Sequence, residues 1–314
     1  MSERSAGLED RRMVLRYAGR CRVCEMQLPA GTDAIYERSR RTVRCVQCEP
    51  STRVVDAAAF DDSTTTSAPP SDALRLRAPA SSVITELLRI QADVPTRSAT
   101  ARLFGRSPLS DESLSWYLGS LGELEVARVL DRLGDGWLVV HAIPVGSAGS
   151  DIDHLVVGPG GVFTINAKFH EGASVWVGSR RLLVNGQKTD HLRNAAFEAR
   201  RVAGILTSAA GAPVGVTPIV AVVAEGRITV KERPADVVVL SSGRLARWLQ
   251  NRSAVLTSDE VARLQRLVAI PETWGDHSLE PADLAGFAAL RETVAKARRR
   301  RRIWAFGVLA APLA

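Results

Sequence analysis

Residues 149–168 contain two apolar runs rich in β-branched residues, on either side of a Gly-Pro-Gly-Gly sequence that starts at Gly158. Such runs around a glycine- and proline-rich turn are typical of a β-hairpin. Elsewhere, segments with helical spacing of apolar residues alternate with short apolar runs. Helices are expected at 82–91, 110–134, 190–208, 241–251 and 258–269, and strands at 137–145, 174–177, 181–184, 216–223 and 236–240. This alternation predicts an α/β fold.

The hairpin places four polar residues in register with one another. If the outer glycines of the turn pair, Asp153 lies opposite Asn166 and Asp151 lies opposite Lys168. Side chains alternate across a strand, so these four would share one face, close enough for Asp153 and Asn166 to share one divalent ion. The other face would bury Ile152, Val156, Phe163 and Ile165. A bulge would shift this register by one residue.

In the helix expected at 110–134, Glu123 and Glu125 are the candidates for an acid that points towards the hairpin. Residues two apart in a helix point in directions about 200° apart, so only one of these two glutamates can face the sheet. On the sequence alone, either is equally a solvated surface charge. Gly119 and Gly122 each cost roughly 1 kcal/mol of helix propensity, which a close approach of this helix to the sheet would compensate.

Composition and charge favour a basic protein with an anionic partner. A length of 314 residues with 46% hydrophobic content predicts one substantial core plus smaller appendages. The net charge of +7 and the pI near 9.7 favour an anionic partner but do not identify it. Lysine occurs only at Lys168, Lys188, Lys231 and Lys296, so a lysine at a motif position is less easily accidental. No apolar segment follows the charged first residues, and we therefore expect a cytoplasmic protein.

All four cysteines lie near the N-terminus in two C-x-x-C pairs with 20 residues between the pairs: Cys21, Cys24, Cys45 and Cys48. Two such pairs present four thiolates to one tetrahedral zinc ion, and this pattern resembles a zinc ribbon. The zinc would be structural, because no further cysteine or nearby histidine offers an open coordination site. Two disulfides or a redox role are the alternatives. Four arginines between the pairs, Arg38, Arg40, Arg41 and Arg44, would contact phosphates or balance the charge of the zinc centre.

Three short motifs follow one another between Gly119 and Lys168. They are G-S-L-G-E, which ends at Glu123, I-D-H, which is centred on Asp153, and G-V-F-T-I-N-A-K, which ends at Lys168. Their order and spacing resemble the nuclease-related domain (NERD), a branch of the PD-(D/E)xK, restriction-endonuclease-like superfamily. The resemblance covers roughly residues 113–225 and implies a mixed sheet flanked by helices. It also selects Glu123 over Glu125 as the inward-pointing acid.

The resemblance implies a metal-dependent nuclease that hydrolyses phosphodiester bonds of DNA, with the zinc ribbon aiding nucleic-acid binding. Glu123 and Asp153 would supply carboxylates to Mg²⁺ or Mn²⁺, and the Asn166 side-chain oxygen and the Ala167 carbonyl would complete the protein ligands. Lys168 would orient the attacking water or stabilise charge at phosphorus. Without the family resemblance, Asp153 and Lys168 are also explained as a salt bridge across the hairpin or as charges at the edge of a strand.

One position departs from the superfamily pattern. Asn166 stands where the superfamily usually has Glu or Asp, two residues before the lysine. An amide oxygen can bind Mg²⁺ but brings no negative charge, so metal affinity should fall unless Asp151 compensates. Two hypotheses follow. One is a metal-dependent nuclease, and the other is a nucleic-acid-binding protein whose nuclease fold has lost turnover.

These patterns divide the chain into a zinc-ribbon-like domain (1–53), a linker with a short helix (54–112), a NERD-like nuclease domain (113–251) and a helical C-terminal region (252–314). The last region contains a helix expected to end in the five arginines that start at Arg298, followed by twelve apolar residues that reach Ala314. Twelve are too few to span a bilayer, which needs about twenty. Residues 298–314 could hold the protein on an anionic membrane, bind nucleic acid, or be a solvated end.

Overall fold

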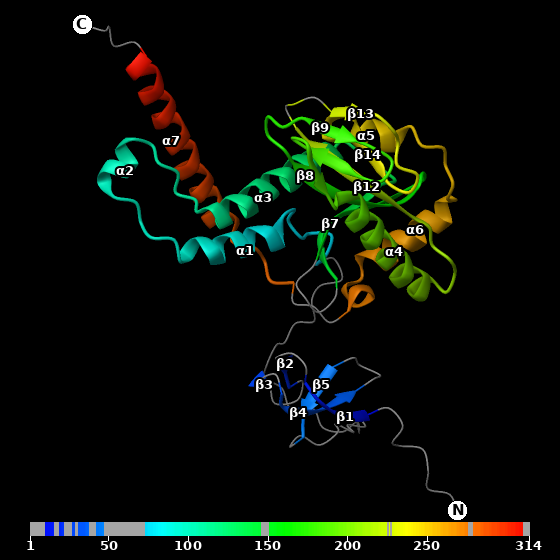
Figure 1. Ribbon diagram of the computed structural model, residues 1–314. Helices are drawn as coiled ribbons and strands as arrows, with labels where there is room; N and C mark the ends of the chain where they lie inside the picture. The colour runs from blue at the N-terminus through cyan, green and yellow to red at the C-terminus, as the bar shows by residue number, and fades with distance from the viewer. Residues whose placement is uncertain are drawn as a thin grey trace, which may run out of the picture. The chain divides into compact units, whose positions relative to one another are not determined.

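The computed structural model describes residues 10–15, 19–21, 27–28, 31–37, 42–46, 73–145, 151–224, 226, 228–275 and 279–309, and the chain divides into two compact units, Met1–Thr66 and Ser67–Ala314 (Figure 1). The first unit has an antiparallel sheet in the order β1 (Asp10–Val14), β4 (Asp33–Glu37), β5 (Thr42–Cys45), and a pair formed by β2 (Gly19–Arg20) and β3 (Gln27–Leu28). Its core is formed by Leu15, Cys21, Leu28, Ala34 and Cys45.

A mixed five-stranded sheet forms the centre of the second unit. Its order is β14 (Val238–Ser241), β12 (Val216–Val223), β8 (Gly161–Phe169), β7 (Asp151–Gly158) and β6 (Leu138–Pro144). Strand β12 runs parallel to β8 and β14, whereas β7 runs antiparallel to β8 and β6. Strands β8 and β12 are buried along most of their length, which explains their nearly continuous apolar sequences. This architecture confirms the predicted α/β fold class.

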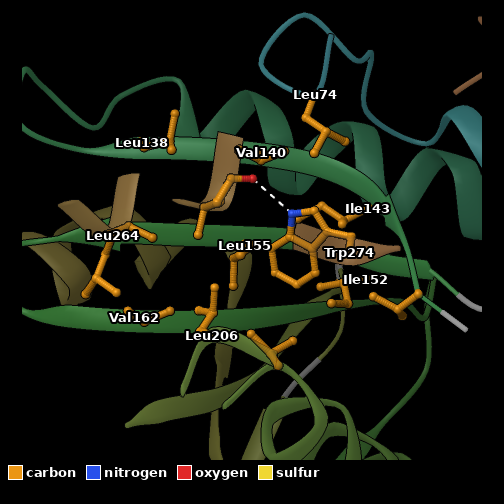
Figure 2. Close-up of a cluster of buried hydrophobic side chains, with 14 residues drawn as sticks. Leu74, Leu138, Val140, Ile143, Ile152, Leu155, Val162, Leu206, Leu264 and Trp274 are labelled. Atoms are coloured by element: carbon orange, nitrogen blue, oxygen red, sulfur yellow. Dashed lines mark hydrogen bonds between the residues drawn. The ribbon is translucent and has the colours of Figure 1, made fainter. Parts of the chain in front are cut away.

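Helices cover both faces of this sheet, and each face has its own core (Figure 1). On one face, α3 (Asp111–Leu130) and α5 (Ser242–Gln250) pack against β7, β8 and β12, through a cluster that includes Val126, Val156, Phe163, Ile165 and Leu245. On the other, α4 (His191–Ala210) and α6 (Ser258–Ala269) contribute Val202, Leu206, Leu264 and Val268. Figure 2 shows how the short 3-10 helix η1 (Pro271–Trp274) closes the second core, where the Trp274 indole N–H donates to the Val268 carbonyl at 3.0 Å.

A second, four-stranded sheet and three further helices complete this unit. The sheet has the order β11 (Gln187–Thr189), β10 (Leu182–Val184), β9 (Val175–Val177), β13 (Ile228–Val230). Helix α1 (Ser81–Ala92) and helix α7 (Leu284–Leu309) pack with α3 around Ile84, Leu87, Tyr117, Phe287 and Val294. The short α2 (Ala99–Leu103) lies in the segment between α1 and α3.

The structure corrects two expectations. The helix with the arginine run does not end there, because α7 continues through Arg302 to Leu309. Arginine, alanine and leucine favour helix, so nothing in the sequence required it to stop. Ile152 was expected to pack with Val156, but it lies in the opposite cluster with Leu155. Helix α2 and strands β11 and β13 had not been predicted; each has only three to five residues.

Candidate active site

The β7–β8 hairpin forms in the predicted register over its outer part. Gly158 pairs with Gly161, and the pairing continues to His154 opposite Ile165. A Cβ atom at Gly158 would lie 2.2 Å from the Trp137 ring, so only glycine fits there. Gly161 has φ of +121°, a conformation that glycine adopts without strain. The turn therefore fixes which residues of both strands lie at the open end of the hairpin.

Regular pairing is interrupted at Asp153, and this interruption places its carboxylate. The pairs with β8 stop at His154, and the pairs with β6 skip Ala142, whose φ of +48° is uncommon for a residue other than glycine. The backbone N–H of Ala167 donates to Asp153 Oδ2 at 2.7 Å. The Asp153 side chain thus accepts the hydrogen bond from this backbone N–H of β8. The same irregularity explains why Ile152 changes face relative to Val156.

Helix α3 turns Glu123, and not Glu125, towards the sheet. Glu123 is 5% exposed, whereas Glu125 forms an exposed ion pair with Arg128 at 2.6 Å. At Gly122 an added Cβ would lie 3.1 Å from the Phe169 Cβ and 3.4 Å from its backbone nitrogen. The glycine therefore allows the helix to approach β8 closely at the position next to Glu123.

Asn166 contacts an acid that the sequence motifs do not include. Its Nδ2 donates to both carboxylate oxygens of Glu198, at 3.0 Å each. Glu198 belongs to α4 and lies between the buried Ala195 and Ala199 in sequence. This position next to the buried side of α4 is the only sequence signal for Glu198, because its contact with Asn166 depends on how α4 packs on β8. The local pattern F-E-A-R-R reads as an ordinary helix surface.

The carboxylates of this cluster interact with one another and with Lys168. Burial raises the pKa of Asp153 to about 6, although Lys168 lowers it. Burial raises the pKa of Glu198 to about 7, and the charge of Asp153 adds to this effect. The pKa of Glu123 is raised well above its usual value by burial, then by Asp153 and Asp151. Burial also raises the pKa of Asp151. Buried carboxylates that raise one another's pKa attract a cation, because its positive charge stabilises their ionised forms.

The oxygens present suit a hard divalent cation. Glu123 Oε2, Asp151 Oδ2 and Asn166 Oδ1 are all buried and have no hydrogen-bond partner within the described structure. Three unpaired acceptor oxygens in one cluster are costly unless something binds them, and Mg²⁺ and Mn²⁺ prefer oxygen ligands. Within the described ranges, no group of three or more His, Cys, Asp or Glu is arranged to hold a metal. The metal ligands expected from the sequence are of another kind, because only two of them are carboxylates. The other two are the Asn166 side-chain oxygen and the Ala167 carbonyl oxygen.

Two histidines lie beside Lys168 and are absent from the sequence motifs. The rings of His170 and His191 lie 5.6 Å apart between centroids. Burial, followed by the charge of Lys168, lowers the pKa of both, and that of His191 to about 4. Both imidazoles are therefore neutral near pH 7, so the positive charge at this edge of the cluster is that of Lys168.

The cysteine site is described only in part. Cys21 and Cys45 are buried, and the backbone N–H of Cys45 donates to Cys21 Sγ at 3.1 Å. Cys24 and Cys48 lie outside the described residues. The structure thus brings one cysteine of each C-x-x-C pair together.

Residues 118–223 match the family model of the nuclease-related domain, NERD. The matched segment extends from α3 to the end of β12 and contains Glu123, Asp153, Asn166, Lys168 and Glu198. No curated protein and no solved structure matches the chain. The match confirms the resemblance to the nuclease-related domain over less than half of the chain.

Proposed function

We propose that this protein is a metal-dependent nuclease that hydrolyses phosphodiester bonds of DNA, with its site at the open end of the β7–β8 hairpin. The observation that carries the proposal is the contact between Asn166 and Glu198. It answers the main objection from the sequence, which is that Asn166 lacks the negative charge usual at its position. Glu198, the side chain that Asn166 contacts, supplies this charge when its carboxyl is ionised, above a pKa of about 7 in the metal-free protein.

The amide orientation supports this assignment. A carboxylate only accepts hydrogen bonds, so Glu198 draws the Nδ2 group of Asn166 towards itself. The Asn166 Oδ1 atom is thereby left as an acceptor without a partner among the described groups. Asn166 and Glu198 together thus provide an oxygen ligand and a negative charge next to it, which a single Asp or Glu would otherwise combine.

Each remaining residue has a role that follows from its surroundings. Glu123, Asp153, Asn166 and the Ala167 carbonyl would hold Mg²⁺ or Mn²⁺, which supplies Lewis acidity and lowers the pKa of a bound water. The Ala167 N–H fixes the Asp153 carboxylate at 2.7 Å. Lys168 binds the phosphate or orients the attacking water. A Glu198 carboxyl with a pKa of about 7 can accept a proton from water near neutral pH.

The four cysteines of the first unit fit a structural zinc site. We assign a structural zinc ion to Cys21, Cys24, Cys45 and Cys48. In support, Cys21 and Cys45 are buried side by side, and an N–H donor on Cys21 Sγ stabilises a thiolate. The net charge of +7, which is that of the whole chain, favours an anionic substrate such as DNA.

Cleavage of linear, circular and single-stranded DNA with Mg²⁺ or Mn²⁺ tests the proposal. Asp153→Ala and Lys168→Ala should abolish cleavage, whereas the surface variants Asp135→Ala and Lys188→Ala should cleave as the wild type does. Metal-dependent cleavage that persists in Asp153→Ala would show a contaminating nuclease or another site. If the wild type is inert but binds DNA, the hypothesis of a nuclease fold without turnover replaces this one.

A further inference from the structure

Helix α2 and the last turns of α7 together form a surface that the proposed nuclease site does not use. The Trp304 indole N–H donates to the Leu103 carbonyl at 2.9 Å, and Arg300 Nη1 donates to the Arg102 carbonyl at 2.9 Å. A Cβ atom at Gly105 would lie 2.5 Å from backbone atoms of α7. These backbone contacts join the two segments, which lie beside one another away from the central sheet (Figure 1).

Four large apolar side chains are exposed on this surface. Leu103 is 54% exposed, Phe104 55%, Ile303 60% and Trp304 43%. The rings of Phe104 and Trp304 lie 5.0 Å apart between centroids. A groove of about 600 Å³ is lined by Ala99, Arg102, Leu103, Arg300, Ile303 and Trp304. Contiguous exposed apolar side chains of this kind indicate a binding surface more often than a solvated one.

Positive charge surrounds the apolar side chains. Residues 95–106 contain Arg97, Arg102 and Arg106 and no acid, and residues 296–309 contain Lys296 and the five arginines from Arg298 to Arg302, again with no acid. Lys296 is paired with Glu292 and Arg298 with Glu171. The pKa of Arg97 is lowered by burial, with contributions from the charges of Arg102 and Arg300. The two segments thus hold a high density of positive charge around an apolar centre.

We propose that this basic–apolar surface, formed by Leu103, Phe104, Ile303, Trp304 and the arginines around them, binds the surface of an anionic lipid bilayer. A bilayer surface offers phosphate and carboxylate headgroups to the arginines and acyl chains to the apolar side chains. Tryptophan and phenylalanine beside arginine suit the boundary between these two layers. Duplex DNA offers phosphates but no apolar layer for Leu103 and Ile303. Among the described residues, no helix is long and apolar enough to cross a membrane.

Co-sedimentation of the full chain with vesicles tests this inference. The protein should pellet with phosphatidylcholine vesicles that contain phosphatidylserine, but not with pure phosphatidylcholine vesicles, and added salt should weaken the binding. Leu103→Ser/Ile303→Ser should reduce binding because it removes apolar contacts with the bilayer. The variant keeps the hydrogen bond from the Trp304 indole to the backbone carbonyl of residue 103. Val230→Ser/Val255→Ser is the matched control, since those valines are 47% and 68% exposed and lie in β13 and in the loop between α5 and α6.

The charge contribution has its own variant. Arg299→Gln/Arg302→Gln should lower the partition coefficient roughly 30-fold, as expected for two charges at about 1 kcal/mol each. Arg200→Gln/Arg266→Gln, two exposed arginines on α4 and α6, should leave it unchanged. The inference is wrong if anionic vesicles bind no better than neutral ones, or if Leu103→Ser/Ile303→Ser binds them as the wild type does. Loss of duplex DNA binding in Arg299→Gln/Arg302→Gln, with vesicle binding retained, would reassign the surface to nucleic acid.

Discussion

Replacing Glu198 with glutamine should change how the stability of the metal-free protein depends on pH. The folded state holds Glu198 with a pKa of about 7, against the ordinary value of 4.5, because the side chain is buried near Asp153. An acid whose pKa is raised on folding stabilises the protein while it keeps its proton, and this contribution is lost as pH rises from about 4.5 through 7. A shift of about 2.5 units corresponds to about 3 kcal/mol when fully expressed.

Between pH 5 and pH 8, the wild type should therefore lose about 2–3 kcal/mol of unfolding free energy relative to Glu198→Gln. Urea denaturation of both proteins at each pH, in the presence of a chelator, measures this difference. Glu232→Gln, at an exposed glutamate, is the control and should show no such change. A wild-type-minus-variant difference that stays constant from pH 5 to pH 8 would refute the burial and repulsion inferred for Glu198.

Three further predictions concern the site and the first unit. Gly122→Ala should cost about 1–3 kcal/mol in urea denaturation, because its Cβ would lie 3.1 Å from that of Phe169, and no loss would show that α3 can move away. Asn166→Asp should reduce metal-dependent DNA cleavage, because the new carboxylate would be in contact with that of Glu198. Adding Glu198→Gln should restore part of the activity. Higher activity in Asn166→Asp than in the wild type would contradict this prediction. Cys45→Ser should lower the zinc content measured by atomic absorption, whereas unchanged zinc would exclude Cys45 as a ligand.

Features that depend on neighbouring residues in the sequence could be predicted. The register of the outer hairpin, from Gly158–Gly161 to His154–Ile165, followed from the turn and from the period of two in its strands, and both are local. The predicted pairing of Asp153 with Asn166 and of Asp151 with Lys168 was wrong, because the β7–β8 pairs stop at His154. The α6 boundaries agree with the sequence prediction because Thr257 and Glu260 form a capping box just before an apolar period. The matched NERD segment contains the four residues that the sequence motifs selected, Glu123, Asp153, Asn166 and Lys168.

Features that depend on tertiary packing could not be predicted. Glu198 reaches Asn166 only because α4 packs across β8, and the sequence between them does not encode that distance. The change of face at Ile152 arises from an interruption of pairing with β6 at Ala142, where alanine gives no local sign of a positive φ. Likewise, the contact of α7 with the segment after α2 depends on packing, because Trp304 donates a hydrogen bond to the carbonyl of Leu103, 201 residues away in the chain.

Binding of Mn²⁺ to the purified chain, followed by the paramagnetic resonance signal of the free ion, tests the central claim most directly because it does not depend on turnover. The wild type should bind Mn²⁺, Mg²⁺ should compete for the site, and Asp153→Asn and Glu198→Gln should weaken binding by at least about tenfold. The surface variant Asp135→Asn should bind as the wild type does. Absence of Mn²⁺ binding by the wild type, or equal binding by Asp153→Asn, would contradict a metal site at the open end of this hairpin.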